Sequence, residues 1–285
     1  MKIIQPSAYY LRQTDDMFGH IAQCARLCYK SDRTTGSEAL CERLWRDGHR
    51  SMFRHWTFYY IIPDIRRQPQ HIRQAVDEYA ASPYAAVVRK DGTAYMSCNG
   101  QFAREHIMSM TQLNAFNVSL RTFAAHAVGS DEVLALVRFT IVVTTSIGIT
   151  RELNRVSPNN IAEQSTRYVD FGKHGGVTVC EPSWYAGRNF LVRFLARQMW
   201  RTEAAFYGVC RNILGLKPEE ARGYLPLDTA SRAAYTYTVS EWHHILNLRL
   251  RGTTGKAHPD AQRVAGLVKQ LIDNRLRLYS ATASV

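Results

Sequence analysis

Residues 136–149 read LVRFTIVVTTSIGI and contain the most apolar stretch of the chain, Phe139 to Ile149. The run is rich in β-branched residues and is too short to span a bilayer, so it predicts a buried strand. A polar segment, Arg151 to Phe171, follows it directly. Because ligands in α/β proteins are commonly held where strands end, we expect a binding site at this junction.

The polar segment itself reads RELNRVSPNNIAEQSTRYVDF. It combines arginines, carboxylates, a serine and a tyrosine within a short distance. Any single arginine here is more simply explained as an ordinary surface charge. The cluster as a whole instead favours an anion site, because arginine binds phosphate and carboxylate groups in a bidentate fashion.

The overall composition limits the classes of protein to consider. The chain has 285 residues, of which 46% are hydrophobic and 21% charged, so it is neither disordered, collagenous nor a disulfide-rich mini-protein. Lys and Arg number 36 against 24 acidic residues, a net charge of +12 that indicates an anionic partner. The basic residues are scattered, which favours a nucleotide over a nucleic-acid track, and we expect no nucleic-acid partner.

The terminus and the cysteines indicate the compartment. The start MKIIQPSAYYLRQTDD lacks the apolar core of a signal peptide, and no stretch is long enough for a membrane span, so we expect a soluble cytoplasmic protein without a membrane partner. Its six cysteines form no CxxC pair, which predicts reduced thiols and no metal site. Cys24 and Cys28, one helical turn apart, read as core side chains rather than ligands.

Periodicity and turn signals give the remaining elements. We expect strands at 53–62 and 136–149 and a hairpin in VVRKDGTAYM (87–96) around Asp91-Gly92. Helices are expected at 16–29, 37–47, 68–81, 99–127 and 189–214, from Pro218, from a Ser240 cap to Gly252, and from Pro259. These predict one α/β (α+β) domain over residues 1–285, with an inserted helical and hairpin elaboration at about 66–134. Neither G-x-G-x-x-G nor G-x-x-x-x-G-K-[ST] is present, so the sequence predicts neither a Rossmann nor a P-loop nucleotide site.

Several motifs resemble, in order, those of the flavin-dependent thymidylate synthase (ThyX) family. They are Cys28-Tyr29-Lys30-Ser31, GHRSMFRH at 48–55, STRY at 165–168, EARGYLP at 220–226 and EWHHILNLR at 241–249. The resemblance implies that family's fold, an antiparallel sheet packed with long helices, and a homotetramer with shared active sites. It also implies C5-methylation of a uridylate, with FAD as cofactor and NADPH and methylenetetrahydrofolate as co-substrates.

The resemblance assigns roles residue by residue. Ser165, Arg167 and Arg249 would be catalytic. Uridylate would be bound by these three together with Arg151, Glu152, Glu163, Thr166 and Arg222. The flavin would be held by His49, Ser51, Arg54, Arg155, Val156, Ser157, Thr238 and His244. This donor set suits the chemistry, because charge-assisted hydrogen bonds hold phosphate and polarise the uracil carbonyls so that C5 becomes nucleophilic.

The chain departs from the family pattern on the flavin side. Arg155-Val156-Ser157 stands where the family has Arg-His-Arg, and Thr238 and Ser240 replace its usual Asn and Arg. The uridylate residues are intact. This pattern resembles the branch that methylates UMP and dUMP for polyoxin-type nucleoside antibiotics. The alternatives are a strictly dUMP-specific thymidylate synthase, a pseudoenzyme that has lost flavin, and a non-catalytic basic protein that binds nucleotides or nucleic acid.

Overall fold

The apolar run at 136–149 divides into a strand and a helix. In the computed structural model, which describes residues 1–31, 35–173 and 176–282, strand β7 spans Arg138–Ser146 and helix α8 spans Ile147–Leu153. The predicted continuation of the strand to Ile149 is wrong, because the Ser146 side chain accepts a hydrogen bond from the Ile149 N–H (3.4 Å) and starts the helix there. This cap turns the chain toward the polar segment.

Strand β7 lies inside a four-stranded antiparallel sheet of order β2-β7-β10-β8. It pairs with β2 (Ser7–Leu11) and β10 (Ala230–Thr238), and β10 pairs in turn with β8 (Ile161–Glu163). The β10–β7 ladder pairs Tyr235 with Ile141 and runs the length of both strands. A small parallel pair, β1 (Lys2–Ile4) with β9 (Thr178–Cys180), extends the structure at one end. The antiparallel sheet and its helices confirm the predicted α+β class.

A second four-stranded sheet, of order β4-β5-β3-β6, takes all its strands from residues 57–118. It consists of β3 (Thr57–Ile62), β4 (Ala85–Lys90), β5 (Thr93–Asn99) and β6 (Asn117–Val118). Asp91 and Gly92 have φ values of 48° and 78°, so the hairpin predicted there is confirmed. Near these strands in sequence are the short turn η2 (Ile65–Arg67) and the helices α3 (Gln70–Ala80) and α7 (Asp131–Leu134).

Two predicted elements in this region are wrong in their extent. The helix expected at 99–127 is broken into α4 (Gly100–Glu105), α5 (Ile107–Leu113), η3 (Asn114–Phe116) and α6 (Leu120–Ala127). It breaks because β6 pairs with Tyr59 and Tyr60 of β3, and Ser119 then caps α6. The strand expected from residue 53 begins at Thr57 instead, after the 3₁₀ turn η1 (Arg50–His55).

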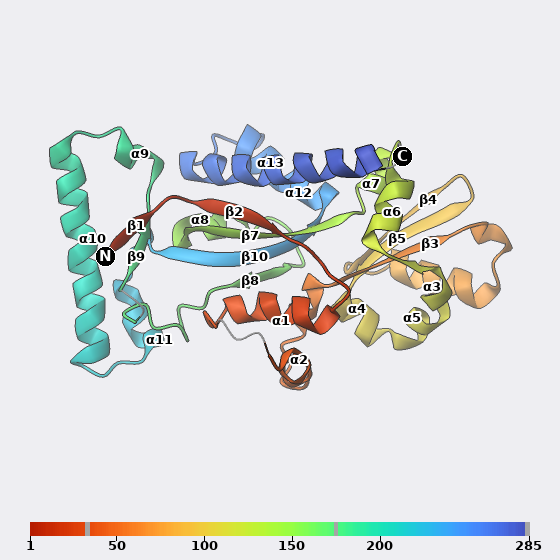
Figure 1. Ribbon diagram of the computed structural model, residues 1–285, viewed down its shortest axis with the longest axis horizontal. Helices are drawn as coiled ribbons and strands as arrows, with labels where there is room; N and C mark the ends of the chain where they lie inside the picture. Colours follow the sequence, from red (N-terminus) through yellow and green to blue (C-terminus); the bar gives the residue numbers. More distant parts are fainter. Residues whose placement is uncertain (32–34, 174–175, 283–285) are drawn as a thin grey trace.

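Helices cover both faces of the first sheet (Figure 1). One face carries α12 (Val239–Leu246), the π-helical turn η5 (Asn247–Arg251) and α13 (Pro259–Thr282). The other face carries α1 (Met17–Leu27), with α2 (Ser37–Arg46) packed beyond it. The core between sheet and helices is aromatic: Tyr235, Tyr237 and Trp242 are fully buried, and the Trp242 indole donates to the Phe139 carbonyl (3.2 Å). Thr238 rather than Ser240 caps α12, because Glu241 completes a capping box with it.

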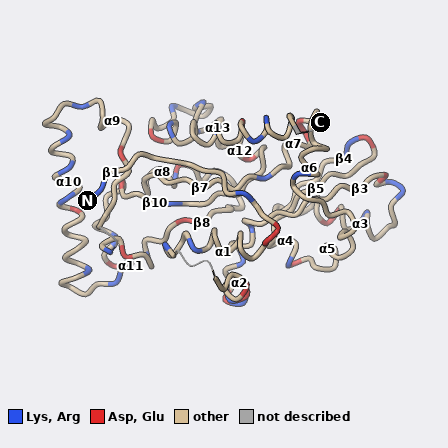
Figure 2. Tube along the Cα trace, in the orientation of Figure 1, with Lys and Arg blue, Asp and Glu red and all other residues tan. Residues whose placement is uncertain are grey.

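Helix α10 (Phe190–Asn212) stands at one end of the molecule, as Figure 1 shows. It confirms the long helix predicted at 189–214. The short α9 (Ser183–Ala186), α11 (Pro218–Ala221) and η4 (Arg222–Tyr224) lie beside it in sequence. Lysine and arginine are distributed over most elements rather than along one track (Figure 2).

Two buried histidines make stability depend on pH. His55 Nδ1 lies 2.8 Å from Thr236 Oγ1, and burial lowers the pKa of His55 to about 3 and that of His20 to about 4. In the unfolded chain both take up protons below about pH 6.5, so their contribution is fully present above that pH and is lost as pH falls toward the folded pKa values. Each histidine should remove up to about 1.4 kcal/mol per pH unit below 6.5.

We therefore expect the melting temperature to fall between pH 7 and pH 5, and to fall less steeply in His55→Gln than in the natural chain. Thermal unfolding at several pH values measures both slopes. Equal slopes would show that His55 is protonated without cost in the fold, contrary to its burial.

Candidate functional site

The segment Ser165–Tyr168 turns away from the end of β8 and is anchored by its own backbone. Ser165 N–H donates to the Cys28 carbonyl at the end of α1 (2.9 Å). The Ser165 hydroxyl accepts from the Arg167 N–H (3.1 Å), and Val169 N–H donates to the Ser165 carbonyl (3.1 Å). These bonds hold Thr166 and Arg167 in a tight turn whose side chains face outward.

Five side chains gather at this turn: Thr166, Arg167, Tyr168, Glu219 and Arg222. We call them the uridylate cluster, after the ligand that the sequence predicts for this segment. Arg167 pairs with Glu219 of α11 through Nε and Nη2 (3.2 and 3.1 Å), and Arg222 Nη1 donates to Thr166 Oγ1 (3.4 Å). The Arg167 guanidinium also lies 5.4 Å from the ring centroid of Tyr168. The structure thus brings Arg222 to Thr166, which neighbours Arg167 and lies 56 residues earlier in the chain. The exposed guanidinium groups of Arg167 and Arg222 present an anion site.

Glu163 lies at the end of β8 beneath this turn. Its Oε1 accepts hydrogen bonds from Thr150 Oγ1 (2.7 Å) and Ser231 Oγ (3.1 Å). Thr150 is on α8 and Ser231 is on β10, so the carboxylate joins three elements. Its two hydroxyl partners fix Glu163 at the junction where the sequence predicts a site.

A second group of side chains, the α8 cluster, consists of Glu152, Arg155 and Arg249. Arg249, on η5, donates from Nε to the Glu152 carbonyl (2.6 Å) and lies 3.1 Å from its carboxylate through Nη2. The Arg155 guanidinium is 3.6 Å from the same carboxylate. Arg151, also on α8, is exposed. Among the described residues, no hydrogen bond or ion pair connects this group directly with the uridylate cluster. Thr150, on the same helix as Glu152, bonds instead to Glu163 at the end of β8.

On the predicted flavin side, three segments meet at Asn159 and Asn160. Arg54 of η1 donates from Nη1 to the Asn159 carbonyl (2.8 Å) and from Nε to Gln101 Oε1 (2.7 Å). The Thr236 N–H of β10 donates to the Asn160 carbonyl (3.0 Å). Arg54 therefore lies against the loop that carries Arg155 and Ser157, and both of these side chains are exposed.

Three other residues predicted for the flavin, His49, Ser51 and His244, lie on different segments and differ in exposure. His49 is exposed and borders a cavity of about 790 Å³ between α1 and α2, which Tyr29 also lines. The Tyr29 ring is 5.6 Å from that of Tyr168, so this cavity lies close to the uridylate cluster. Ser51 is half-buried in η1, and His244 is exposed on α12.

A family model described as thymidylate synthase complementing protein matches residues 84–276. The chain belongs to this family. A search of the curated proteins finds no match. The matched range includes every residue predicted to bind uridylate, from Arg151 to Arg249, but not His49, Ser51 or Arg54.

Membership in the family raises the question of whether these residues fit FAD. Val156 is half-buried against the main hydrophobic core, and the buried Thr238 hydroxyl caps α12 by accepting from the Glu241 N–H (3.1 Å). His49, Ser51, Arg54, Arg155, Ser157 and His244 are at least partly exposed. Among described residues, Asn154 Oδ1 and Asn160 Oδ1 are buried without a hydrogen-bond partner, on the loop beside Arg54. The two arginines suit the diphosphate of FAD, and the two amide oxygens can accept hydrogen bonds from its N–H or O–H groups, so the residues fit FAD.

Sequence reasoning missed several partners of these side chains. Glu219 pairs with Arg167, Thr150 and Ser231 orient Glu163, and Tyr84 lies under the Arg54 guanidinium, 4.8 Å from its ring centroid. Only Thr150 had a local signal, since it directly precedes the polar segment. The others come from distant elements and carry no spacing pattern.

Two further features concern the whole described chain. Within residues 1–31, 35–173 and 176–282, no His, Cys, Asp and Glu side chains gather in a group that could hold a metal ion. No helix in the same part of the chain has the length and apolarity to cross a membrane.

Proposed function

We propose that this thymidylate synthase complementing protein transfers a one-carbon unit to C5 of a uridylate, UMP or dUMP, and yields the 5-methyl nucleotide. Methylenetetrahydrofolate is the carbon donor and NADPH is the reductant. The observation that supports this most strongly is the uridylate cluster, in which Thr166, Arg167 and Arg222 converge within the range that matches the family. Convergent guanidinium groups provide the charge that phosphate binding requires.

Each side chain then has a defined task. Arg167, Arg222 and Ser165 bind the nucleotide, together with Thr166 of the same turn and Arg151 of α8. Glu152 and Glu163 lie near its sugar and base. Arg249 hydrogen-bonds a uracil carbonyl oxygen and stabilises the enolate-like form of the ring, in which that oxygen carries negative charge and C5 is nucleophilic.

Bound FAD supplies the hydride chemistry that reduces the transferred carbon. Arg54 and Arg155 would hold its phosphates, with His49, Ser51, Ser157 and His244 contributing polar contacts. The altered Arg155-Val156-Ser157 segment leaves fewer side chains for this purpose than the family pattern provides. We infer a rebuilt flavin pocket and, with it, a specialised methylase of UMP and dUMP rather than a strict thymidylate synthase.

Flavin titration separates this proposal from its alternatives. The enzyme should quench FAD fluorescence, and Arg54→Ala should weaken that quenching more than Arg121→Ala on the exposed side of α6. Absence of quenching with intact uridylate binding would favour a pseudoenzyme. Tight polynucleotide binding with a steep salt dependence, and no nucleotide or flavin binding, would favour a non-catalytic nucleic-acid-binding protein.

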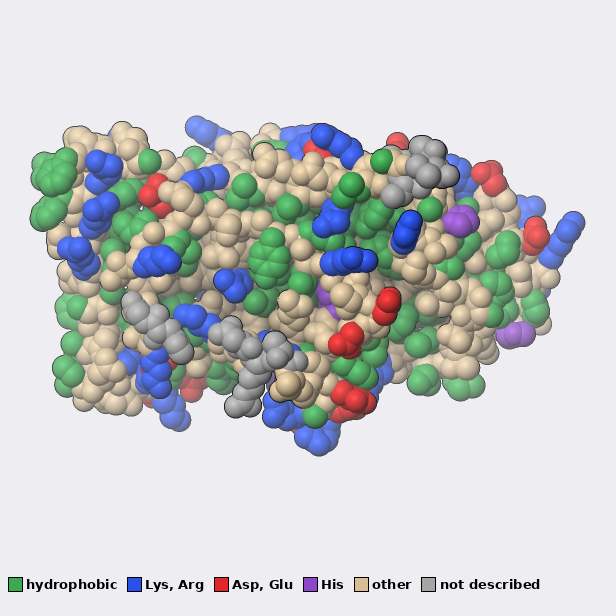
Figure 3. Space-filling view, viewed as in Figure 1, with side chains coloured by type: hydrophobic (Ala, Val, Ile, Leu, Met, Phe, Trp, Pro, Cys, Tyr) green, Lys and Arg blue, Asp and Glu red, His purple; other side chains and the backbone are tan. Residues whose placement is uncertain are grey.

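We further propose a homotetramer in a cytoplasmic setting, where the six free cysteines stay reduced. Helix α10 supports the assembly, because it turns Trp200 and Tyr207 inward and leaves a long apolar face exposed, as the left edge of Figure 3 shows. That face comprises Phe190, Leu191, Phe194, Leu195, Met199, Phe206, Val209, Ile213 and Leu214. An exposed apolar face of this length is typical of a protein interface.

Light scattering tests the assembly. The natural chain should have a mass of four times 32.5 kDa, and Leu195→Glu with Met199→Glu should shift it to smaller species, since two charges cannot be buried unpaired. Arg201→Gln, on the same helix but polar already, is the control. A natural chain that is monomeric and fully active would contradict shared active sites.

A further inference from the structure

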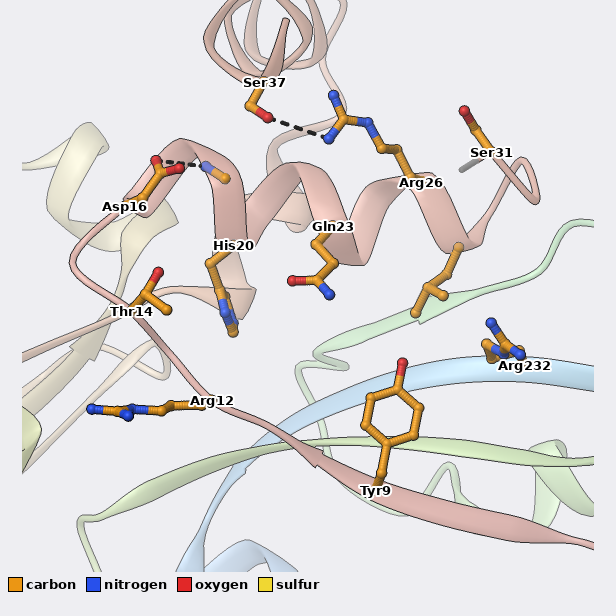
Figure 4. A pocket seen from close by; sticks show the side chains of 12 residues that line it. Tyr9, Arg12, Thr14, Asp16, His20, Gln23, Arg26, Ser31, Ser37 and Arg232 are labelled. Atoms are coloured by element: carbon orange, nitrogen blue, oxygen red, sulfur yellow. Dashed lines mark hydrogen bonds between the residues drawn. The ribbon is translucent and has the colours of Figure 1, made fainter. Parts of the chain in front are cut away.

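A groove lies between helix α1 and the face of the first sheet that α1 covers. None of the residues that line it has been assigned to uridylate or flavin above. The groove has a volume of about 480 Å³ and is bordered by Tyr9 and Arg12 at β2, by α1, and by Arg232 of β10. In Figure 4, Tyr9 points from β2 toward α1, while His20 and Gln23 point from α1 toward β2. Arg12 and Arg232 stand at opposite ends of this view. A volume of this size is typical of sites for small ligands.

The positive charge of this groove is not neutralised by its surroundings. Arg26 donates to Ser37 Oγ (3.2 Å) and to the Thr35 carbonyl (2.7 Å), which are both uncharged acceptors. In the part of the chain that the structure describes, no ion pair within 4.0 Å involves Arg12, Arg26 or Arg232. Arg167 and Arg249, by contrast, each have a carboxylate partner. Among the described residues, these three guanidinium groups of the groove therefore have no carboxylate partner.

The single carboxylate in the groove is already engaged. Asp16 caps α1 by accepting from the Gly19 N–H (2.8 Å), and a Cβ at residue 19 would lie 2.0 Å from an Asp16 carboxylate oxygen. Gly19 thus keeps Asp16 turned onto the helix. His20 adds no positive charge at pH 7, because burial lowers its pKa to about 4. Three guanidinium groups face one carboxylate that is held by the helix.

A neighbouring cavity of about 320 Å³ shares Arg26, Ser31 and Arg232 with the groove. It continues to Gln164 and Ser231, next to Glu163 and Ser165. Arg12 borders only the groove. Tyr9 and Arg12 lie outside the range matched by the family model, so this end of the groove belongs to the part of the chain that the family assignment does not explain.

We propose that this groove is an anion-binding site of its own, taking a ligand with several closely spaced negative groups, such as a chain of phosphates or carboxylates. Arg12, Arg26 and Arg232 bind the anionic groups along the groove, and Gln23 supplies an uncharged hydrogen-bond partner. Tyr9, which is 43% exposed, offers a flat face beside them on which the uncharged part of the ligand packs. Tyr9 and Arg12 line the groove but not the neighbouring cavity, so binding at this end can be tested separately from the proposed function.

Calorimetric titration of the full-length protein with tripolyphosphate, ATP and triglutamate tests this site. Binding of at least one probe is expected, weakening as salt rises. Arg12→Gln and Arg232→Gln should each weaken it about ten-fold, because each removes a charge-assisted contact. Arg121→Gln, an exposed site on α6 with the same change in net charge, should leave it unchanged.

The probes also identify the ligand class. Tighter binding of ATP than of tripolyphosphate, lost in Tyr9→Leu, assigns a nucleotide; preference for triglutamate assigns a polycarboxylate. Binding of dUMP should be the same in Arg12→Gln as in the natural chain, which separates this site from the uridylate cluster. No binding of any probe, equal weakening in the Arg121→Gln control, or an effect of Arg232→Gln without one of Arg12→Gln would overturn the proposal.

Discussion

Replacing Arg249 by alanine is expected to reduce uridylate turnover on the order of 10²- to 10³-fold, the loss that follows removal of one donor to a developing oxyanion. The Arg249 side chain is only 13% exposed and is held by both the carbonyl and the carboxylate of Glu152. Its position is therefore fixed before substrate binds, and little reorganisation is needed when charge develops on the uracil. The measurement is the turnover rate at saturating nucleotide and co-substrates.

Two variants show whether this loss is chemical. Arg251→Ala lies on the same π-helical turn and is exposed, so it should retain turnover within a few-fold. Arg249→Lys keeps the charge and should recover part of the activity without restoring the natural rate, because an ammonium lacks the bidentate fork. Natural turnover in Arg249→Ala, with an unchanged melting temperature, would remove Arg249 from the catalytic assignment.

Arg167→Ala is expected to weaken uridylate binding by about 2 kcal/mol, roughly 30-fold, because it removes a charge-assisted partner of the phosphate or base. The fold should be unaffected, since the side chain is 55% exposed and its pair with Glu219 is of the surface type, which contributes little to stability. Equilibrium dialysis with dUMP and with UMP gives the two dissociation constants.

Glu219→Gln is the matched control for that variant. It breaks the same ion pair while leaving the guanidinium in place, so dUMP affinity should change by less than about five-fold. If Glu219→Gln weakened dUMP binding as much as Arg167→Ala, the pair would act as a structural unit and Arg167 would not bind the nucleotide directly.

Local signals in the sequence predicted much of the fold. Asp91-Gly92 located a hairpin, and Pro259 marked the start of α13, because both signals act within a few residues. The errors arose where tertiary contacts overrode local preference. The apolar run became a helix after Ser146, and the helix expected at 99–127 was broken at Asn117–Val118 by pairing with β3. Neither the cap nor the pairing is visible in the periodicity of one segment.

The candidate site was predictable to a different degree. The polar segment after the apolar run indicated Glu163 and Arg167 directly, since they share one short stretch. Contacts between distant elements were not predictable: Arg249 meets Glu152 across 97 residues of sequence. The groove was missed for the same reason. Arg12 follows β2, Arg26 is on α1 and Arg232 is on β10, so they are far apart in the sequence and form no motif.

Release of the C5 hydrogen from uridylate is the most direct test of the proposed function. The purified protein is incubated with FAD, NADPH, methylenetetrahydrofolate and dUMP or UMP carrying a hydrogen isotope at C5. Release of the isotope is followed, and the mass of the product is measured by mass spectrometry. We predict release from both nucleotides and a product heavier by one methylene unit. Release from dUMP alone would indicate a strict thymidylate synthase, and release from neither, with FAD bound, would contradict the proposed methylation.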